Sequence, residues 1–172
     1  MAYIVNELIS SVSVLSIGDL SKLEGDEVFE QATTDKDALI EDVGLISTLP
    51  EGIANEGTWH EGGVWKADSH CSEIRIDTTG RFVYIGNRGH DSIAVFAVDQ
   101  ATGKLERTAC CPSGGEFPRN FNFSACGQFM VVGNQRSNSV CVFAINQGDG
   151  TLDLKSQVAV PSPNFVFSTS AN

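Results

Sequence analysis

A segment of about 47 residues occurs twice in this chain, and this repeat restricts the fold more than any other feature of the sequence. Residues 79–98 read TGRFVYIGNRGHDSIAVFAV, and residues 126–145 read CGQFMVVGNQRSNSVCVFAI. The constant offset of 47 aligns Asn87 with Asn134. A third copy opens the chain and aligns Asn6 with Asn87 at an offset of 81. A chain built from such copies is expected to fold as a series of similar units.

Each copy divides into short apolar segments that turn residues separate. In the second copy we expect strands at 73–77, 82–87, 92–98 and 105–109, with glycine, threonine and aspartate between them. Four strands in a period of 40–50 residues are typical of a β-propeller blade. We therefore predict an all-β fold, a partial β-propeller with about three four-stranded blades.

The ends of the chain fall inside blades rather than between them. The first copy starts at its second strand, and we interpret residues 164–168 as the first strand of a further blade. A propeller needs at least about four blades to close its ring. We therefore expect residues 1–172 to form an incomplete propeller domain. Either missing N-terminal blades or association into a homo-oligomer would close the ring.

Two segments interrupt the repeat. Residues 18–42 form an acidic insertion, and within it residues 24–42 hold eight acidic residues against one lysine, which gives seven of the eleven net negative charges of the chain. Charge runs of this kind are usually solvated, so we expect a surface segment. Residues 57–66 are expected to be an irregular insertion, in which Trp59 and Trp65 either plug the rim of the ring or line a pocket.

The composition excludes several classes of function. A net charge of −11 opposes binding to a nucleic-acid backbone, and no apolar run reaches the roughly 18 residues that a membrane span needs. The five cysteines include no CxxC pair and the three histidines lack metal-ligand spacing, so we expect no metal and no cofactor. Cys126 and Cys141 occupy repeat positions and are interpreted as small core residues. This cysteine usage predicts a reducing, cytoplasmic location.

Candidate functional residues follow from the repeat itself. In a propeller, the loops between second and third strands share a face with the loops that enter the first strands. In the loop between its second and third strands, each copy has a different residue after the asparagine, namely Glu7, Arg88 and Gln135. An acid, a base and an amide on one repeated scaffold indicate a site built from unlike groups. The asparagine itself is interpreted as a structural turn residue.

Three further residues are expected near this face. Arg119 begins the first strand of the third copy, which should bring it to the mouth of the central channel. His90 lies in the turn after Arg88 and is either a substrate contact or only a turn residue. Glu73 is a candidate to line the channel. For the two arginines, anion binding competes with surface salt bridging as an interpretation.

A set of segments along the chain resembles the seven-bladed propeller lactonase family. These segments read YIVNELISSVSVLSI, ISTLPEG, NRGHDSIAVFAVD, TGKL, FPRNF and VPSPNFV. The family includes the propeller-type 6-phosphogluconolactonases and the fungal 3-carboxy-cis,cis-muconate cyclases. The resemblance covers nearly the whole chain apart from the two insertions, and it implies that the chain corresponds to the C-terminal half of a family protein.

The resemblance implies that Glu7, Arg88 and Arg119 match polar site positions of the family, with His90 nearby. The implied reaction is the hydrolysis of 6-phosphoglucono-δ-lactone, a phosphorylated sugar lactone of the pentose phosphate pathway. A carboxylate such as Glu7 would orient the attacking water, and guanidinium groups would bind the phosphate and the developing oxyanion. The family's upstream Arg/His motif is absent from this chain, so we expect the isolated chain to have little or no activity.

Two other functions remain open from the sequence. The first is an isomerase that resembles the muconate cyclases, since no residue in this chain separates them from the lactonases. The second is a non-catalytic propeller fragment that binds partners. Three segments favour either enzyme over the non-catalytic fragment: Asn-Glu-Leu, Asn-Arg-Gly-His and Phe-Pro-Arg-Asn-Phe.

Overall fold

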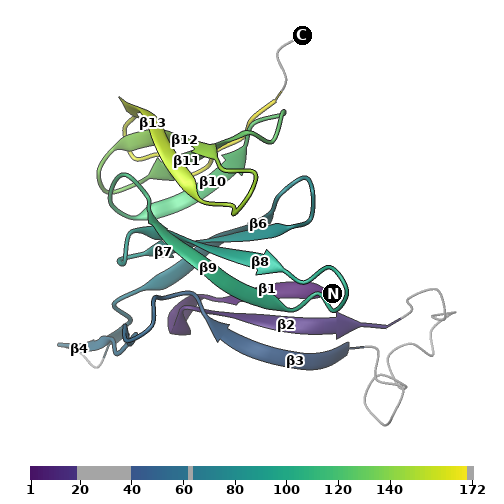
Figure 1. Cartoon of the computed structure of the whole chain (residues 1–172). Helices are drawn as coiled ribbons and strands as arrows, with labels where there is room; N and C mark the ends of the chain where they lie inside the picture. Colours follow the sequence, from purple (N-terminus) through teal and green to yellow (C-terminus); the bar gives the residue numbers. More distant parts are fainter. Residues whose placement is uncertain (19–39, 62–63, 170–172) are drawn as a thin grey trace, which may run out of the picture.

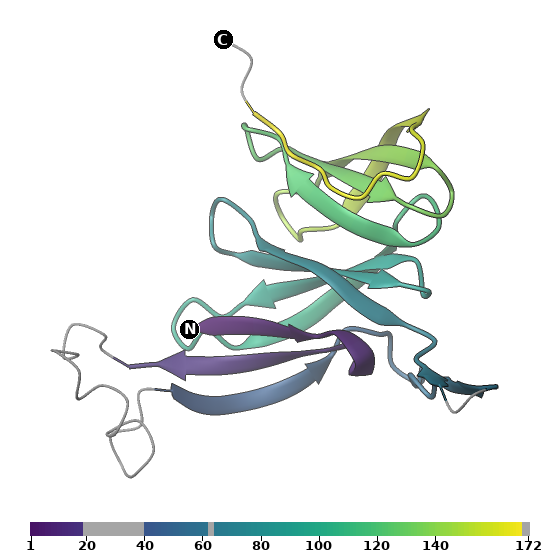
Figure 2. The same ribbon diagram turned by 180° about the vertical axis from the view of Figure 1, so that it is seen from behind.

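The computed structural model describes residues 1–18, 40–61 and 64–169. Within these ranges the chain forms three antiparallel sheets of three or four strands, stacked as layers, and a separate two-stranded ribbon. The N-terminus lies in the lowest layer of Figure 1 and the C-terminus above the highest. Figure 2 shows the same stack from behind. The predicted all-β fold and the predicted series of propeller blades are both confirmed.

The three blades follow one another along the chain. The first sheet contains β1 (Ala2–Asn6), β2 (Ser11–Ile17) and β3 (Ile40–Ser47), and the 3-10 helix η1 (Glu7–Ile9) joins its first two strands. The second sheet contains β6 (His70–Ile76), β7 (Phe82–Arg88), β8 (Ser92–Val98) and β9 (Leu105–Pro112). The third contains β10 (Pro118–Phe123), β11 (Phe129–Asn134), β12 (Ser139–Ile145) and β13 (Leu152–Ala159).

The hydrophobic cores lie between consecutive blades. All seven residues of β7 are buried, because the second sheet is covered by another sheet on each of its faces. One apolar cluster joins the first blade to the second through Val12, Val83 and Phe96. A separate cluster joins the second blade to the third through Tyr84 and Phe121. Apolar residues that alternate along each strand thus serve two different cores.

Polar contacts also join the first strands of neighbouring blades. Ser72 on β6 donates its hydroxyl to the carbonyl of Pro118 on β10 at 2.7 Å. Arg75 donates from Nε to the carbonyl of Phe121 at 3.0 Å. These bonds fix the level of β10 against β6 and hence the relative position of the loops at the ends of the two blades.

Some expectations about individual segments are corrected by the structure. The 57–66 segment is not wholly irregular, because β4 (Thr58–His60) and β5 (Val64–Lys66) pair there as a short ribbon. Residues 164–168 form no strand. This segment is held to β10 by side-chain bonds instead, including one from the Val166 amide to Asn120 Oδ1 at 2.8 Å.

Of the acidic insertion at 18–42, residues 19–39 lie outside the described residues, whereas residues 40–42 belong to β3.

Cys141 is buried as predicted, but Cys126 is exposed in the turn before β11, so its expected place in the core is wrong. Strand β6 begins at His70, before the expected start at residue 73. A bulge in β6 lets its pairing with β7 continue as far as Arg88.

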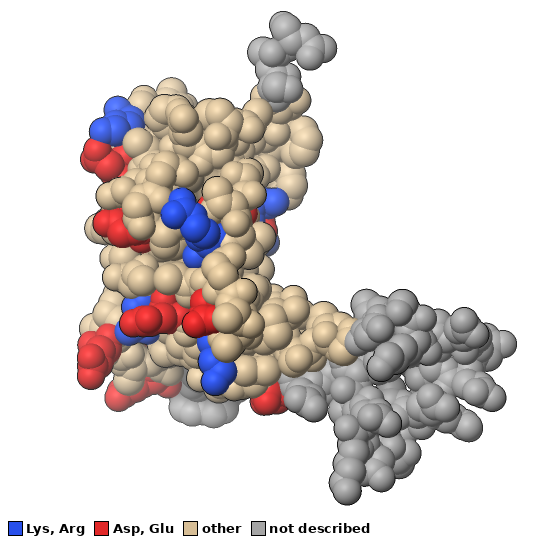
Figure 3. Space-filling view, turned by 45° about the vertical axis from the view of Figure 1, so that its right-hand side comes forward, with Lys and Arg blue, Asp and Glu red and all other residues tan. Residues whose placement is uncertain are grey.

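Charges of both signs occur on the face of the molecule that Figure 3 shows. On the face in Figure 3, basic and acidic side chains are interspersed among uncharged residues rather than gathered by sign. Among the described residues, no helix is long and apolar enough to cross a membrane.

Candidate functional site

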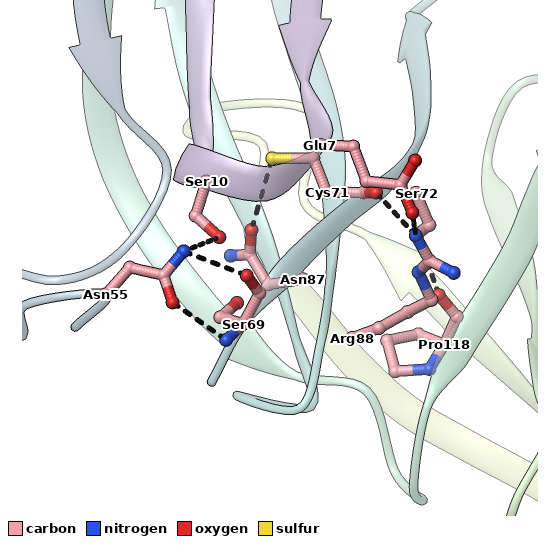
Figure 4. A network of polar contacts seen from close by, with 9 residues as sticks. All are labelled: Glu7, Ser10, Asn55, Ser69, Cys71, Ser72, Asn87, Arg88 and Pro118. Atoms are coloured by element: carbon pink, nitrogen blue, oxygen red, sulfur yellow. Dashed lines mark hydrogen bonds and ion pairs between the residues drawn. The ribbon is translucent and has the colours of Figure 1, made fainter. Parts of the chain in front are cut away.

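Glu7 and Arg88 come from corresponding loops of the first two blades and form an ion pair. Glu7 begins η1 after β1, and Arg88 ends β7, so the pair joins positions that the repeat had aligned. The Arg88 Nη2 group donates to Glu7 Oε1 and to the carbonyl of Cys71, the latter at 3.0 Å. Figure 4 shows both oxygens converging on the guanidinium group. The structure therefore brings together two of the three residues that the repeat aligned.

The two partners of this pair differ in their exposure. The Arg88 side chain is 9% exposed, whereas the Glu7 side chain is 59% exposed. The Nε atom of Arg88 is buried and has no hydrogen-bond partner among the described residues. A buried guanidinium group requires a nearby anion, so loss of Glu7 would leave Arg88 without charge compensation. Arg88 thus fixes Glu7, while the carboxylate itself remains open to solvent.

The repeated asparagine has a structural role, although it does not form the turn. Asn87 is fully buried near the end of β7 and donates from Nδ2 to the carbonyl of Thr48 at 3.1 Å, while the Thr48 hydroxyl donates to Asn87 Oδ1 at 2.7 Å. In the next blade, Asn134 donates to the carbonyl of Ser113 at 2.9 Å. Each asparagine therefore ties the end of its strand to the segment that arrives from the preceding blade.

Cys71 lies beneath the ion pair as a structural residue. Burial raises the pKa of its thiol, against the smaller lowering effects of the Thr48 hydrogen bond and the Arg88 charge. A thiol whose pKa is raised is protonated near neutral pH and is a poor nucleophile. The contribution of Cys71 to the site is its backbone carbonyl, which accepts the second bond from Arg88.

Bulges in the first strands place the other predicted residues. The pairing of β10 with β11 shifts between Pro118 and Asn120, so Arg119 is the extra residue of a β-bulge. Ser72 and Glu73 occupy the corresponding bulge of β6. An added Cβ at Gly86, which faces this bulge, would overlap the Ser72 hydroxyl, so a larger residue there would displace the Ser72 side chain. The bulges turn residues of the first strands out of the regular ladder.

Arg119 and Glu73 differ in their contacts. The Arg119 side chain is exposed, and among the described residues it has neither a hydrogen bond nor an ion pair. Glu73 accepts a hydrogen bond from Asn120 Nδ2, and Arg75 Nε lies 3.7 Å from its carboxylate. Glu73 is thus used in joining β6 to β10, whereas Arg119 is free to bind an anion.

His90 and Gln135 are less engaged than the sequence suggested. His90 Nδ1 lies 2.8 Å from the Ser92 hydroxyl, a contact within its own turn. The backbone amide of Gln135 donates to the carbonyl of Phe117 at 2.9 Å, and its side chain makes no polar contact within the described part of the chain. The structure therefore brings together Glu7 and Arg88. Among the described residues, neither His90 nor Gln135 makes a polar contact with that pair.

Sequence reasoning missed three residues that shape this face. Phe117 lies under the guanidinium group of Arg88, at 5.2 Å from the ring centroid, and under that of Arg136, at 4.0 Å. Asn55 donates to the carbonyls of Leu8, at 3.1 Å, and Ser69, at 2.9 Å, which clamps η1 to the segment before β6. Phe117 is the first residue of the FPRNF segment and Arg136 follows Gln135, whereas Asn55 lies outside the repeat and carries no signal.

The described residues contain no group of three or more His, Cys, Asp or Glu side chains that could hold a metal ion. The site instead offers the solvent-facing carboxylate of Glu7 and the guanidinium groups of Arg88 and Arg136, which share the Phe117 ring. Carboxylates act on water, and guanidinium groups bind anionic oxygens. This set of groups can therefore position a water molecule next to an anionic substrate.

Comparison with known proteins gives consistent results. The family model described as "Lactonase, 7-bladed beta-propeller" matches residues 1–168. An uncharacterized protein of Lactococcus lactis is 33% identical over 124 residues, which are 72% of this chain and 28% of that protein.

Two solved structures share the arrangement of the blades. A Lactobacillus plantarum protein has a TM-score of 0.71 and 26% identity, over 95% of this chain and 40% of that one. The periplasmic gluconolactonase of Pseudomonas aeruginosa has a TM-score of 0.70 and 27% identity, over 94% of this chain and 37% of that one. The chain thus spans well under half the length of these proteins. It belongs to the seven-bladed β-propeller lactonase family.

Proposed function

We propose that this chain supplies part of the active site of a lactonase that opens a sugar-acid lactone. The specific reaction that we propose is the hydrolysis of 6-phosphoglucono-δ-lactone to 6-phosphogluconate, a step of carbohydrate metabolism in the pentose phosphate pathway. The observation that carries this proposal is the Glu7–Arg88 pair, in which a buried arginine fixes a solvent-facing carboxylate between two blades. Membership of the lactonase family supports the reaction class.

In the proposed mechanism, Glu7 orients the attacking water. Its carboxylate accepts a proton from the water as the oxygen adds to the ring carbonyl. The bond between the carbonyl carbon and the ring oxygen then breaks, and the proton passes to that oxygen, which becomes the hydroxyl of the open acid. The exposure of Glu7 allows water to reach it, while Arg88 keeps the carboxylate in one orientation.

Arg119 is proposed to stabilise negative charge during the reaction. Its guanidinium group is exposed and has no polar partner among the described residues, and the bulge takes it out of the regular ladder. Positively charged donors aimed at a developing oxyanion are among the most effective catalytic groups. His90, Gln135 and Glu73 are retained as proposed contacts to the sugar.

We propose that the complete site requires further blades. The matched structures are more than twice as long as this chain, which covers 37% to 40% of them. Either additional blades or a second copy would close the ring and complete the wall of the pocket. On this proposal, the 172-residue chain alone has little or no lactonase activity.

A cytoplasmic location is also proposed. All five cysteines are free thiols, which is usual in a reducing compartment. The matched Pseudomonas protein is periplasmic, so fractionation of cells that express the protein is the direct test. Recovery of the protein outside the cytoplasm would contradict this part of the proposal.

The function is tested by measuring release of 6-phosphogluconate above the spontaneous rate, with the protein in its ring-closed form. We expect Glu7→Gln to lower kcat by about 100-fold, because general-base catalysis is commonly worth 10²- to 10⁴-fold. Arg81→Gln is the matched control, since Arg81 lies at the opposite end of β7. A Glu7→Gln variant with the wild-type rate would overturn the proposed role. Parallel assays with 3-carboxy-cis,cis-muconate separate the lactonase from the cyclase.

A further inference from the structure

One aromatic ring on the site face is contacted by two guanidinium groups from different blades. The guanidinium carbon of Arg88, from the second blade, lies 5.2 Å from the centroid of the Phe117 ring. That of Arg136, from the turn between β11 and β12 of the third blade, lies 4.0 Å from the same centroid. Both distances are within the range of cation–π attraction. Two positive charges are thus held near each other by one ring.

The position of this ring is fixed through its backbone. Phe117 has a φ of 64°, in the left-handed region that a bulky residue rarely adopts. Its amide donates to Asp91 Oδ1 at 2.8 Å, and its carbonyl accepts from the Gln135 amide at 2.9 Å. Strained residues of this kind persist where the surroundings over-determine them, and they cluster at functional sites.

The loop that carries Arg136 is fixed in the same way. The Arg136 amide donates to the carbonyl of Glu116 at 3.1 Å, next to the bond between Gln135 and Phe117. The loop between β11 and β12 is therefore tied to the segment that enters β10. As a result, the stacking of Arg136 on Phe117 does not depend on a freely moving loop.

The two arginines differ in their charge compensation. Arg88 is buried and paired with Glu7. Arg136 is exposed, and no carboxylate of the described residues lies within ion-pair distance of it. A guanidinium group that is oriented by an aromatic ring but left without a counter-ion is pre-organised to bind an anion, since its planar donors match a phosphate in pairs.

We propose that Arg136 anchors the phosphate group of the substrate. This inference rests on the proposed lactonase function and adds the residue that would distinguish a phosphorylated lactone from an unphosphorylated one. In the loop between β11 and β12, the proposed phosphate-binding residue is therefore Arg136 and not Gln135, which corresponds to Arg88 in the repeat. Because Arg136 and Phe117 both belong to this chain, the anchor operates even where the pocket wall is incomplete.

The test is the binding of the unreactive product 6-phosphogluconate to the 172-residue chain, measured by calorimetry beside gluconate and inorganic phosphate. We expect 6-phosphogluconate to bind at least tenfold more tightly than gluconate. Weak binding of phosphate alone would show that the phosphate group supplies the recognition. Arg136→Gln should weaken 6-phosphogluconate binding about tenfold, which is the loss of about 1.4 kcal/mol.

Arg81→Gln is the matched control, because Arg81 also stacks on a phenylalanine, Phe82, at 5.4 Å, but at the other end of the blade. Arg136→Lys keeps the charge but loses the planar donors, so its affinity should fall between those of the wild type and Arg136→Gln. Unchanged binding in Arg136→Gln, equal loss in Arg81→Gln, or no binding to the wild-type chain would overturn the inference. Failure of the lactonase proposal would give a different result. The ring-closed protein would then hydrolyse no lactone, although it would still bind 6-phosphogluconate in a way that depends on Arg136.

Discussion

The hydroxyl of Tyr84, in the second blade, donates a hydrogen bond to the carbonyl of Gly150, in the third, at 2.9 Å. Tyr3 makes the corresponding bond from the first blade to the carbonyl of Gly103 in the second, at 2.8 Å. The repeat therefore reproduces a contact between blades as well as the blade itself. Burial raises the pKa of the Tyr84 hydroxyl, so this group stays protonated and continues to donate over the usual pH range.

Replacement of Tyr84 with phenylalanine should destabilise the fold. The substitution leaves the buried Gly150 carbonyl without its donor, which typically costs about 1–2 kcal/mol. Urea denaturation would measure this loss of unfolding free energy. Tyr3→Phe is the matched control and should cost less, because the Tyr3 bond is only partly buried. Equal losses in the two variants would show that burial does not set the strength of this contact.

Replacement of Gly86 with alanine should disturb the junction between the second and third blades. The new methyl group would overlap the Ser72 hydroxyl, which itself donates to Pro118. We expect a loss of about 1–3 kcal/mol, the usual cost of overpacking. Thermal unfolding of the variant would show it.

Gly148→Ala provides the comparison for this substitution, since the nearest atom to its added Cβ is Asn146 Oδ1 at 3.3 Å, in an exposed turn. The double variant Gly86→Ala, Ser72→Ala should recover part of the stability, because it removes the overlapping hydroxyl. Full wild-type stability of Gly86→Ala alone would contradict the packing described for the bulge.

The two repeated asparagines should differ in their importance. Asn87→Ala removes bonds to the Thr48 carbonyl, the Thr48 hydroxyl and the Ser92 hydroxyl, so we expect a loss of about 2–3 kcal/mol. Asn134→Ala removes one bond to a backbone carbonyl and a weaker one to the Cys141 sulfur, but it also removes a buried Oδ1 atom that has no partner among the described residues. Its cost should be about 1 kcal/mol or less. Chemical denaturation of both variants would give the order, and the reverse order would refute this explanation.

Cys126 should be the cysteine that alkylating reagents modify first. Hydrogen bonding, chiefly with the Ser124 side chain, lowers the pKa of its exposed thiol, so a larger fraction is thiolate at a given pH. Burial raises the pKa of the Cys71, Cys110 and Cys141 thiols. Mass spectrometry after brief iodoacetamide treatment at pH 7 to 8 would identify the modified residue. Ser124→Ala should slow the reaction of Cys126, and preferential labelling of Cys71 in the native protein would be inconsistent with its burial.

The fold was largely predictable because the repeat contains the strands themselves. The expected strands at 82–87 and 92–98 correspond to β7 and β8, which end at Arg88 and Val98. The segment at 164–168 has a strand-like sequence but forms none, because a strand requires a partner and no described strand pairs with it. Local pattern alone does not reveal whether that partner is present.

The candidate site was predictable only in part. Glu7 and Arg88 were found because the repeat aligned their loops, and the structure shows them paired. Phe117 and Arg136 were missed for a physical reason. Their contact depends on a left-handed backbone conformation at Phe117 and on a loop from another strand. Neither feature leaves a periodic pattern in the sequence.

The bulge at Arg119 has a consequence for how such a protein can diversify. The corresponding bulge position in the preceding blade is Ser72, which bonds the next blade, whereas the Arg119 side chain bonds no described residue. Because the extra residue lies outside the regular pairing of the sheet, its side chain can change without altering the strand register. Duplicated blades can therefore acquire different chemistry at this one position while the rest of the repeat stays the same.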